Sequence, residues 1–219
     1  MAGARNIQGL LKDDKRFILT LIAEGEHRQQ DFKYRVDDAR KLAKTVSAFA
    51  NTDGGRLLIG VRDDGVIVGV RSEEEIYVMH KAAERYCRPE VNIRFETYRA
   101  DGHTVVVANV PKSDRGPICA QDEDDRMHAY IRINDENIVA SPVLFALWKE
   151  SQKPQGAMIH LDDDIRKLIG VMEGRQTLRQ IVGRSKLPRH KVVTLLAHLI
   201  RFGTVKWEYS EQEFWFGMD

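Results

Sequence analysis

Residues 48–70 read AFANTDGGRLLIGVRDDGVIVGV, and this stretch decides the fold of the first half of the chain. Apolar residues upstream of it recur at the spacing of one helical face, which predicts a helix over residues 39–50. The Asn-Thr-Asp-Gly-Gly run that follows ends this helix, because these residues tolerate turn conformations. Two β-rich runs, 57–61 and 66–70, then flank Asp64-Gly65, a strong signal for a tight hairpin turn.

The middle of the chain predicts further elements of the same domain. A helix is expected over residues 76–86, and strands are expected at 91–98, 104–110 and 127–133. Val105 to Val107 are apolar at consecutive positions, which indicates a strand covered on both faces. These elements predict an α+β domain with a mixed sheet over residues 1–150, including an N-terminal helix.

The 48–70 stretch resembles the central block of the Schlafen-type AlbA-like domain. Two flanking motifs extend the resemblance: residues 26–33, EHRQQDFK, and residues 128–134, HAYIRIN. The resemblance covers residues 26–142 and implies the Schlafen/AlbA-like α+β fold, a mixed sheet with helices. Members of this family are often described as divergent AAA proteins or as transcriptional regulators. Asp31 stands where the family usually has Glu, so one carboxylate lies a methylene closer to the backbone.

The resemblance also implies a candidate catalytic site. Some Schlafen nucleases bind a divalent metal with two glutamates and a hairpin aspartate, and the matching residues here are Glu26, Asp31 and Asp63. Asp64 is an alternative for the third ligand. Carboxylate oxygens suit Mg²⁺ or Mn²⁺, which would polarise a phosphate, and Lys33 would stabilise the charge that develops on it.

The residues themselves allow simpler interpretations. Glu26 and Asp31 are five positions apart, so they converge only if the chain bends between them. Asp63 and Asp64 are explained by a tight turn, and Asp31 with Lys33 by an ion pair on one strand face. Arg132 either faces the carboxylates, orienting them or binding phosphate, or is a buried salt-bridge partner.

A strongly basic segment follows in the last third of the chain. Residues 175–206 contain eight Lys or Arg and no Asp or Glu, so this segment carries +8 while the whole chain carries +1. Its cations are Arg175, Arg179, Arg184, Lys186, Arg189, Lys191, Arg201 and Lys206. A field of one sign attracts phosphate backbones.

The segment belongs to a predicted winged helix-turn-helix domain at residues 157–219. A helix from Pro142 and a polar linker at 151–156 precede it, and three helical patterns and a hairpin follow. The helix that starts at Pro188 is the expected recognition helix. The residues expected to contact nucleic acid are Arg189, His190, Lys191 and Thr194, with Arg184 and Lys186 near phosphates. Arg132 of the first domain is a further expected contact.

The predicted wing carries Glu208, Glu211 and Glu213, whereas a wing that enters the minor groove normally carries Arg or Lys. We therefore expect the wing to stay off the DNA or to meet a protein partner. The aromatic residues around it are expected to pack in a core or a dimer interface.

Composition excludes several other classes of protein. Two cysteines give no disulfide framework and no four-cysteine zinc site, and no apolar run approaches the length of a membrane span. The N-terminus lacks the apolar core of a signal peptide, so a cytoplasmic protein with no membrane association is expected. The glycines lie at a helix end and in a hairpin, without a phosphate-binding loop motif, so backbone turning explains them better than ATP binding.

Taken together, the sequence predicts a nucleic-acid-binding protein, most simply a DNA-binding transcriptional regulator that forms a homodimer. The first alternative is a metal-dependent nuclease that uses Glu26, Asp31 and Asp63. The second is a scaffold whose winged helix binds protein. No cofactor is certain; Mg²⁺ or Mn²⁺ belongs to the nuclease alternative.

Overall fold

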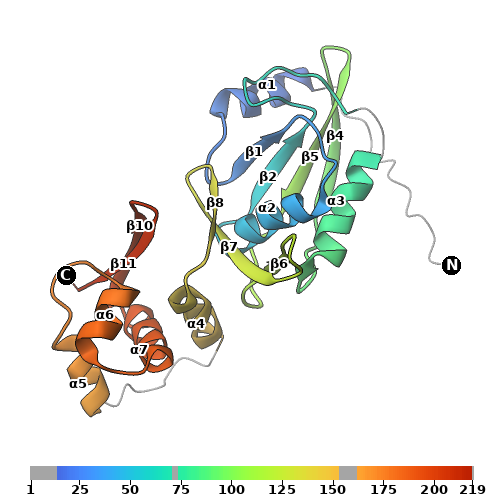
Figure 1. The fold of residues 1–219 in the computed structure, drawn as a ribbon. Helices are drawn as coiled ribbons and strands as arrows, with labels where there is room; N and C mark the ends of the chain where they lie inside the picture. The colour runs from blue at the N-terminus through green and yellow to red at the C-terminus, as the bar shows by residue number, and fades with distance from the viewer. Residues whose placement is uncertain (1–13, 71–73, 153–161, 219) are drawn as a thin grey trace. The chain divides into compact units, whose positions relative to one another are not determined.

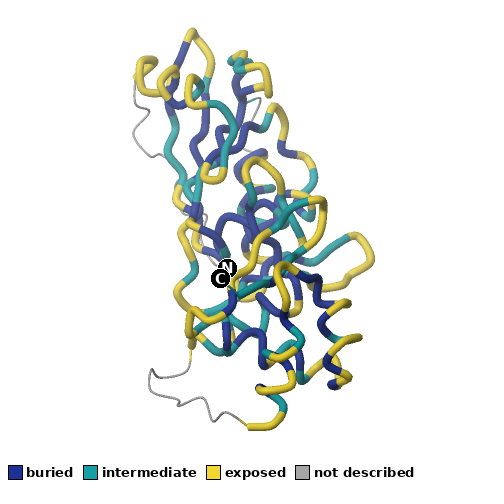
Figure 2. Tube along the Cα trace, turned by 90° about the vertical axis from the view of Figure 1, so that its left-hand side faces the viewer, coloured by how far each residue is buried: buried dark blue, intermediate teal, exposed yellow. Residues whose placement is uncertain are grey.

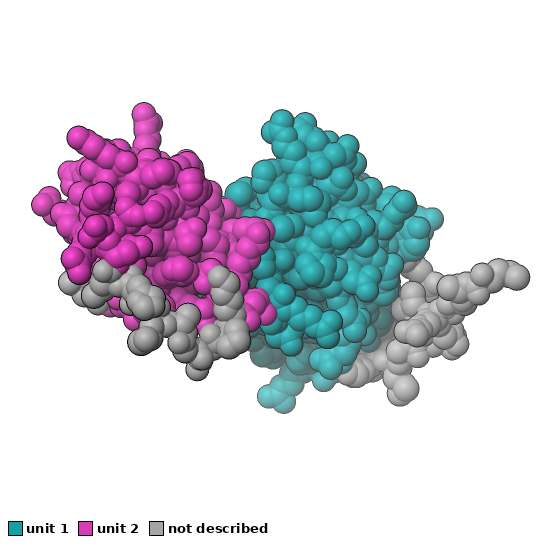
Figure 3. All heavy atoms as spheres, turned by 90° about the horizontal axis from the view of Figure 1, so that it is seen from below, with its two compact units in different colours: residues 1–139 teal, residues 140–219 magenta. Residues whose placement is uncertain are grey.

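The computed structural model describes residues 14–70, 74–152 and 162–218. The described chain divides into two compact units, residues 1–139 and 140–219, which are coloured separately in Figure 3. The mixed α+β architecture and the C-terminal helix-turn-helix are confirmed. The predicted linker at 151–156 falls largely outside the described residues.

The first unit contains three helices and eight strands among its described residues, as labelled in Figure 1. The helices are α1 (Lys15–Glu24), α2 (Ala39–Asn51) and α3 (Glu74–Arg85). The strands are β1 (Gln30–Lys33), β2 (Gly55–Ile59), β3 (Cys87–Arg88), β4 (Arg94–Ala100), β5 (His103–Val110), β6 (Cys119–Gln121), β7 (Met127–Ile133) and β8 (Glu136–Val139).

The main sheet has the strand order β1-β2-β5-β4, with β1 parallel to β2 and the other pairs antiparallel. Its two faces alternate along each strand, as a period of two requires. Leu57 and Val106 pack in a core with α2 and α3, while Leu58 and Val107 pack in a second core with α1. The central strands are thus covered on both faces, as the apolar run 105–107 predicts.

β7 belongs to a second sheet, of order β3-β6-β7-β8, and does not complete the main sheet as the sequence suggested. The reason is α2, whose buried side chains share one core with residues of both sheets. A helix buried on several sides needs partners beyond one sheet, and the second sheet supplies them.

Polar residues at the end of α2 bond directly to the second sheet. Asn51 donates from Nδ2 to the carbonyls of Ile118 and Tyr130 at 2.8 and 2.9 Å, and its Oδ1 accepts from the Ile118 N–H at 2.7 Å. Ser47 accepts from the Tyr130 N–H at 3.0 Å, and Thr52 accepts from the Arg132 N–H at 2.9 Å. These bonds satisfy buried backbone groups that lack a strand partner there.

The predicted hairpin at 57–70 is shorter than expected. Its turn forms, with the Gly65 N–H donating to the Arg62 carbonyl at 2.8 Å, but only the single bridge Val61–Ile67 pairs across it. Beyond the bridge, Gly60 and Gly69 both take positive φ and their backbones touch, so an added Cβ on Gly60 would come within 2.7 Å of Gly69. This close crossing replaces the expected second strand.

The second unit contains four helices and three strands among its described residues. The helices are α4 (Pro142–Ser151), α5 (Asp163–Ile169), α6 (Leu178–Ser185) and α7 (Arg189–Arg201). The strands β9 (Gln176–Thr177), β10 (Lys206–Ser210) and β11 (Glu213–Gly217) form a sheet of order β10-β11-β9. The sequence grouped the helix from Pro142 with the first domain, but α4 packs on α7, with Val143 in the second unit's core.

Figure 2 shows buried chain running through both units, with exposed residues gathered at turns and helix surfaces. Each unit therefore has a core of its own. No helix in the described ranges combines the length and apolar character that a membrane crossing requires.

Candidate functional site

The carboxylates Glu26 and Asp31 are brought together by a bend between α1 and β1. His27 and Gln30 exchange backbone hydrogen bonds of 3.0 and 3.1 Å, which turns the chain back on itself. Glu26 then accepts at Oε1 from the Phe32 N–H at 2.8 Å, on the same side of β1 as the Asp31 carboxyl. The bend that Glu26 and Asp31 need in order to converge is therefore present.

Asp31 is buried, with 4% of its surface exposed, between two cations. Its Oδ1 accepts from Arg132 Nη2 at 3.0 Å, and its Oδ2 lies 2.6 Å from Lys33 Nζ. Burying a carboxylate is costly unless it is paired, and here each oxygen lies beside a cation, Oδ1 in a hydrogen bond and Oδ2 in an ion pair alone.

Arg132 on β7 is the buried partner of Asp31. It is 2% exposed, donates from Nη1 to Asn137 Oδ1 at 2.9 Å, and lies 5.2 Å from the centre of the Phe49 ring. This corrects its assignment as a nucleic-acid contact, because a guanidinium enclosed in the core cannot reach a phosphate. The salt-bridge alternative is the one that the structure contains.

The pKa of Glu26 is raised, first because burial disfavours its charged form, and further by the neighbouring Asp31 carboxyl. The hydrogen bond from the Phe32 N–H and the charge of Lys33 act in the opposite direction. A neighbouring carboxylate disfavours a second negative charge, so Asp31 adds to the preference of Glu26 for its neutral form.

Asp63 does not join these carboxylates. It is exposed in the turn after β2, where Asp64 accepts from the Val66 N–H at 3.2 Å and pairs with Arg62 at 3.0 Å. Asp31 is paired in register with Leu57, so the turn lies beyond the far end of that strand pair. No group of three His, Cys, Asp or Glu side chains in the described ranges lies close enough to hold a metal ion. The described residues therefore do not assemble the three-carboxylate site for Mg²⁺ or Mn²⁺.

In the second unit, α6 and α7 form the helix-turn-helix. Thr177 begins α6 with a reciprocal capping box to Gln180, and Lys186 ends it in the left-handed conformation. Pro188 then begins α7 with its fixed φ. The side chains left exposed at this junction include four of the predicted contacts, namely Arg184, Lys186, Arg189 and His190, and the exposed Thr194 follows one turn later.

Lys191 differs from these neighbours because it forms an ion pair with Asp164 of α5. The hydrogen bond raises the pKa of Lys191 and lowers that of Asp164. Arg184 lies 3.7 Å from Glu173. Among the cations of the basic segment, Arg179, Lys186 and Arg189 make no ion pair with any residue that the structure describes.

The wing carries both acidic and aromatic side chains, and Arg175 contacts both kinds. Arg175 pairs with Glu208 at 3.1 Å and Glu211 at 3.2 Å, and its guanidinium lies 4.2 Å from the centre of the Trp215 ring. Trp207 stays 36% exposed beside Phe214. The run of +8 along the sequence is therefore partly neutralised in space by acids from outside it.

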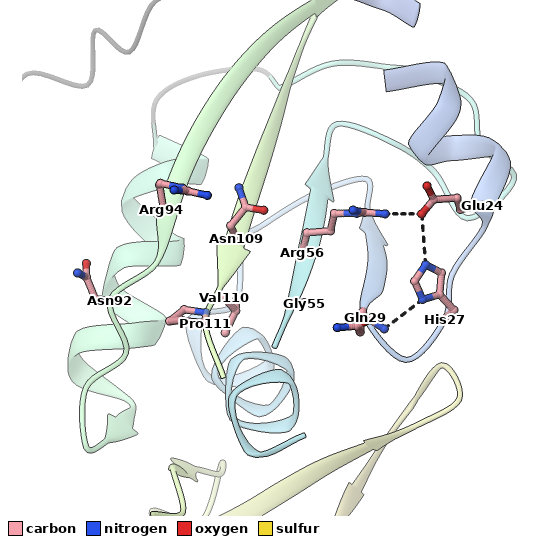
Figure 4. A pocket seen from close by; sticks show the side chains of 10 residues that line it. All are labelled: Glu24, His27, Gln29, Gly55, Arg56, Asn92, Arg94, Asn109, Val110 and Pro111. Atoms are coloured by element: carbon pink, nitrogen blue, oxygen red, sulfur yellow. Dashed lines mark hydrogen bonds and ion pairs between the residues drawn. The ribbon is translucent and has the colours of Figure 1, made fainter. Parts of the chain in front are cut away.

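A polar pocket of 720 Å³ lies at one end of the main sheet (Figure 4). Arg56 of β2, Asn109 of β5 and Arg94 of β4 line it side by side. These residues lie far apart in the sequence, and only strand register brings them together, so no pattern in the sequence pointed to them.

Comparison with known families decides what the first unit is. The family model described as Schlafen, AlbA_2 matches residues 26–141, more than half of the chain. The chain belongs to this family. A second model, described as the RNA polymerase III subunit RPC82 helix-turn-helix domain, matches residues 171–209. We refer below to the AlbA_2 domain (residues 26–141) and to the winged helix (residues 162–218).

Two solved structures are similar to this Schlafen AlbA_2 chain. One is the DIP2311 protein from Corynebacterium diphtheriae, with 18% identity, a TM-score of 0.46, and coverage of 78% of this chain and 32% of that one. The other is the N-terminal domain of a RecG-related protein from Nitrosomonas europaea, with 20% identity, a TM-score of 0.38, and coverage of 69% and 98%. This chain thus spans about a third of the Corynebacterium protein.

The recognition of the family from its three motifs is confirmed, as is the winged helix. An AlbA_2 domain followed by a helix-turn-helix suggests nucleic-acid binding. The structure distinguishes two sets of charged side chains. The α6–α7 junction of the winged helix exposes basic residues, whereas the ion pair of Asp31 with Arg132 in the AlbA_2 domain is buried.

Proposed function

We propose that this protein is a DNA-binding transcriptional regulator whose winged helix places the N-terminal end of α7 in the major groove. The observation that carries the proposal is the pair Lys186 and Arg189, exposed at the α6–α7 junction and without an ion-pair partner among the described residues. In helix-turn-helix proteins this end of the second helix faces the base edges. Unpaired cations there contact DNA without first breaking an ion pair.

Fluorescence anisotropy with labelled duplex DNA tests the proposal. Lys186→Glu with Arg189→Glu should weaken binding by more than about ten-fold, and wild-type affinity should fall steeply with salt, because phosphate contacts release counterions. Arg166→Glu with Lys167→Glu is the control, since it reverses two exposed cations of α5 and so matches the double variant in charge. Equal affinity of the double variant and the control would rule out this assignment of the recognition helix.

The side chains of the wing favour contact with a protein partner over contact with DNA. Exposed Trp207 next to Glu208 and Glu211 suits a protein surface better than a phosphate backbone, which repels carboxylates. We propose that the wing stays off the DNA. Glu211→Lys should then change DNA affinity by less than about two-fold beyond the general effect of charge, whereas a wing in the minor groove would gain much more.

We also propose that the regulator is a cytoplasmic homodimer, because paired half-sites in DNA match a two-fold symmetric protein. Light scattering at tens of micromolar should return the mass of two chains. The mass of one chain would exclude a stable dimer.

The nuclease alternative lacks its third carboxylate in the described residues. Labelled single-stranded RNA, tRNA and DNA should therefore stay intact with Mn²⁺ or Mg²⁺, and wild type and Asp31→Asn should behave alike. Metal-dependent cleavage that disappears in Asp31→Asn and with chelator would restore that alternative.

A further inference from the structure

One face of the main sheet is only half covered. α1 packs Ile18 and Leu21 against Phe32, Leu58 and Tyr98 in the core on this face. Beyond the end of that core, the same face continues through Arg56, Asn109 and Arg94. We refer to these three residues and the pocket that they line as the open sheet face (Figure 4).

The register of the strands fixes how these side chains lie. Arg56 is paired with Asn109, and Asn109 is paired with Arg94, so all three project from one face. Neighbouring strands are about 4.8 Å apart, which separates the backbones at the two arginines by roughly 10 Å. The result is a row of two guanidinium groups with an amide between them.

The two arginines differ in how they are held. Arg56 donates from Nε to Gln30 Oε1 at 2.6 Å and pairs through Nη2 with Glu24, so its guanidinium has a fixed orientation. Arg94 is exposed and makes no hydrogen bond or ion pair with the described part of the chain. Arg56 is thus fixed in orientation but neutralised by Glu24, and Arg94 is the cation that is free to close on a ligand.

Neighbouring side chains favour an anionic ligand with several acceptor oxygens. Gln29 and Asn92 line the pocket with amides. Arg28 and Lys112, which adjoin the lining residues Gln29 and Pro111 in the sequence, share the single carboxylate of Asp53, at 2.8 and 3.2 Å. The four cations of this region face three carboxylates, those of Glu24, Asp53 and Glu96. The only aromatic ring in the lining is the imidazole of His27, which accepts at Nδ1 from the Gln29 N–H and lies at Nε2 3.6 Å from Glu24, and the lining contains no Phe, Tyr or Trp.

We propose that the open sheet face binds the phosphate backbone of nucleic acid, as a second contact surface beside the winged helix. A guanidinium group matches phosphate oxygens in pairs, and the Asn92 amide adds neutral donors. The other two amides are partly used, because Asn109 Nδ2 donates to Glu96 at 3.3 Å and Gln29 Nε2 donates to the Asp53 carbonyl at 3.1 Å. The proposal rests on the proposed nucleic-acid-binding function and adds the AlbA_2 domain to it. Contacts of this kind contribute affinity and orientation, and no sequence preference.

Arg94→Glu and Arg99→Glu form a matched pair for the test. Both residues are exposed arginines on β4, but they are five positions apart, so they project from opposite faces of the sheet. The full-length variants are titrated into labelled duplex and single-stranded DNA by fluorescence anisotropy over a range of salt. Thermal unfolding of both variants verifies that the fold is unchanged.

Arg94→Glu should weaken binding to all sequences alike, roughly three- to ten-fold more than Arg99→Glu does. Arg94→Ala should lower the slope of log affinity against log salt by about one. Equal effects of the two reversals would overturn the inference, because they would reflect net charge alone. If both leave affinity unchanged while the Lys186 and Arg189 reversal abolishes it, the open sheet face is excluded and the proposed function stands. A wild-type chain that binds no nucleic acid would remove both.

Discussion

Arg132 in the AlbA_2 domain and Arg189 in the winged helix have the same side chain and opposite surroundings. Arg132 is 2% exposed and bonds Asp31 and Asn137, whereas Arg189 is exposed at the start of α7 and has no ion-pair partner in the described ranges. A buried arginine is fixed by what it neutralises, and an exposed one is available to an outside ligand. The difference shows that burial, more than residue type, separates structural cations from binding cations.

Replacing Arg132 should have the largest effect on stability. Arg132→Met leaves the buried Asp31 without its main partner, which typically costs about 3–5 kcal/mol. All three tryptophans lie in the second unit, at positions 148, 207 and 215, so tryptophan fluorescence follows that unit. In urea unfolding, the circular dichroism transition should shift to a lower urea concentration. The fluorescence transition of the second unit should stay nearly unchanged.

The control for this variant removes the stranded charge as well. Asp31→Asn combined with Arg132→Met should recover much of the lost stability, because it replaces an unpaired buried carboxylate with a neutral amide. If Arg132→Met instead weakens DNA binding without lowering stability, Arg132 is a contact residue and the comparison with Arg189 fails.

A smaller effect is expected at the start of α6. Thr177→Ala removes the hydroxyl that accepts from the Gln180 N–H in the capping box, at a cost of about 1 kcal/mol. The fluorescence transition should shift to a lower urea concentration, while the circular dichroism transition of the AlbA_2 domain should not shift. Thr177→Ser keeps the cap and is the control. Movement of both transitions together would mean that the units unfold as one.

Lys191 and Arg189 lie two positions apart on α7 and allow a paired cation to be compared with an unpaired one. Lys191→Met should change DNA affinity by less than about two-fold, because its ammonium is already paired with Asp164. Its effect on the fluorescence transition should be smaller than that of Thr177→Ala, since surface ion pairs contribute little. A loss of affinity as large as that of Arg189→Met would show that DNA competes successfully for Lys191.

The smallest effect is expected at Glu26, and it depends on pH. The pKa of Glu26 is raised above 4.5 in the folded protein, so the folded state favours its neutral form, and ionising it lowers stability. Glu26→Gln should match wild type below pH 4.5 and become slightly more stable than wild type as the pH rises through the folded pKa. The gain is modest because Glu26 is only partly buried. A gain that appears only on acidification would contradict the sign of this shift.

Much of the fold could be predicted because local patterns determine it. The apolar face of α2, the turn at Asp64-Gly65 and the order of elements in the winged helix all depend on residues close together in sequence. The predicted strand at 66–70 failed because Gly60 and Gly69 meet there, and a close backbone crossing leaves no periodic signal.

The site was harder to predict because it depends on distant residues. Asp31 and Arg132 are 101 positions apart, and Lys191 meets Asp164 from another helix. The charge run at 175–206 indicated a basic surface, but several of its cations are paired with acids outside the run. Arg56, Asn109 and Arg94 left no signal, since only strand register aligns them.

Asn51 has a consequence for how relatives of this protein are found. Asn51 carries the only side-chain amide in the stretch 48–70. This amide makes three bonds to the backbone of Tyr130 in β7 and of Ile118 just before β6. The part of this stretch that Asn51 contributes is therefore a joint between a helix and a sheet, and the bonds of that joint specify no reaction. Two chains that share the joint share an architecture, and their activities have to be established one chain at a time.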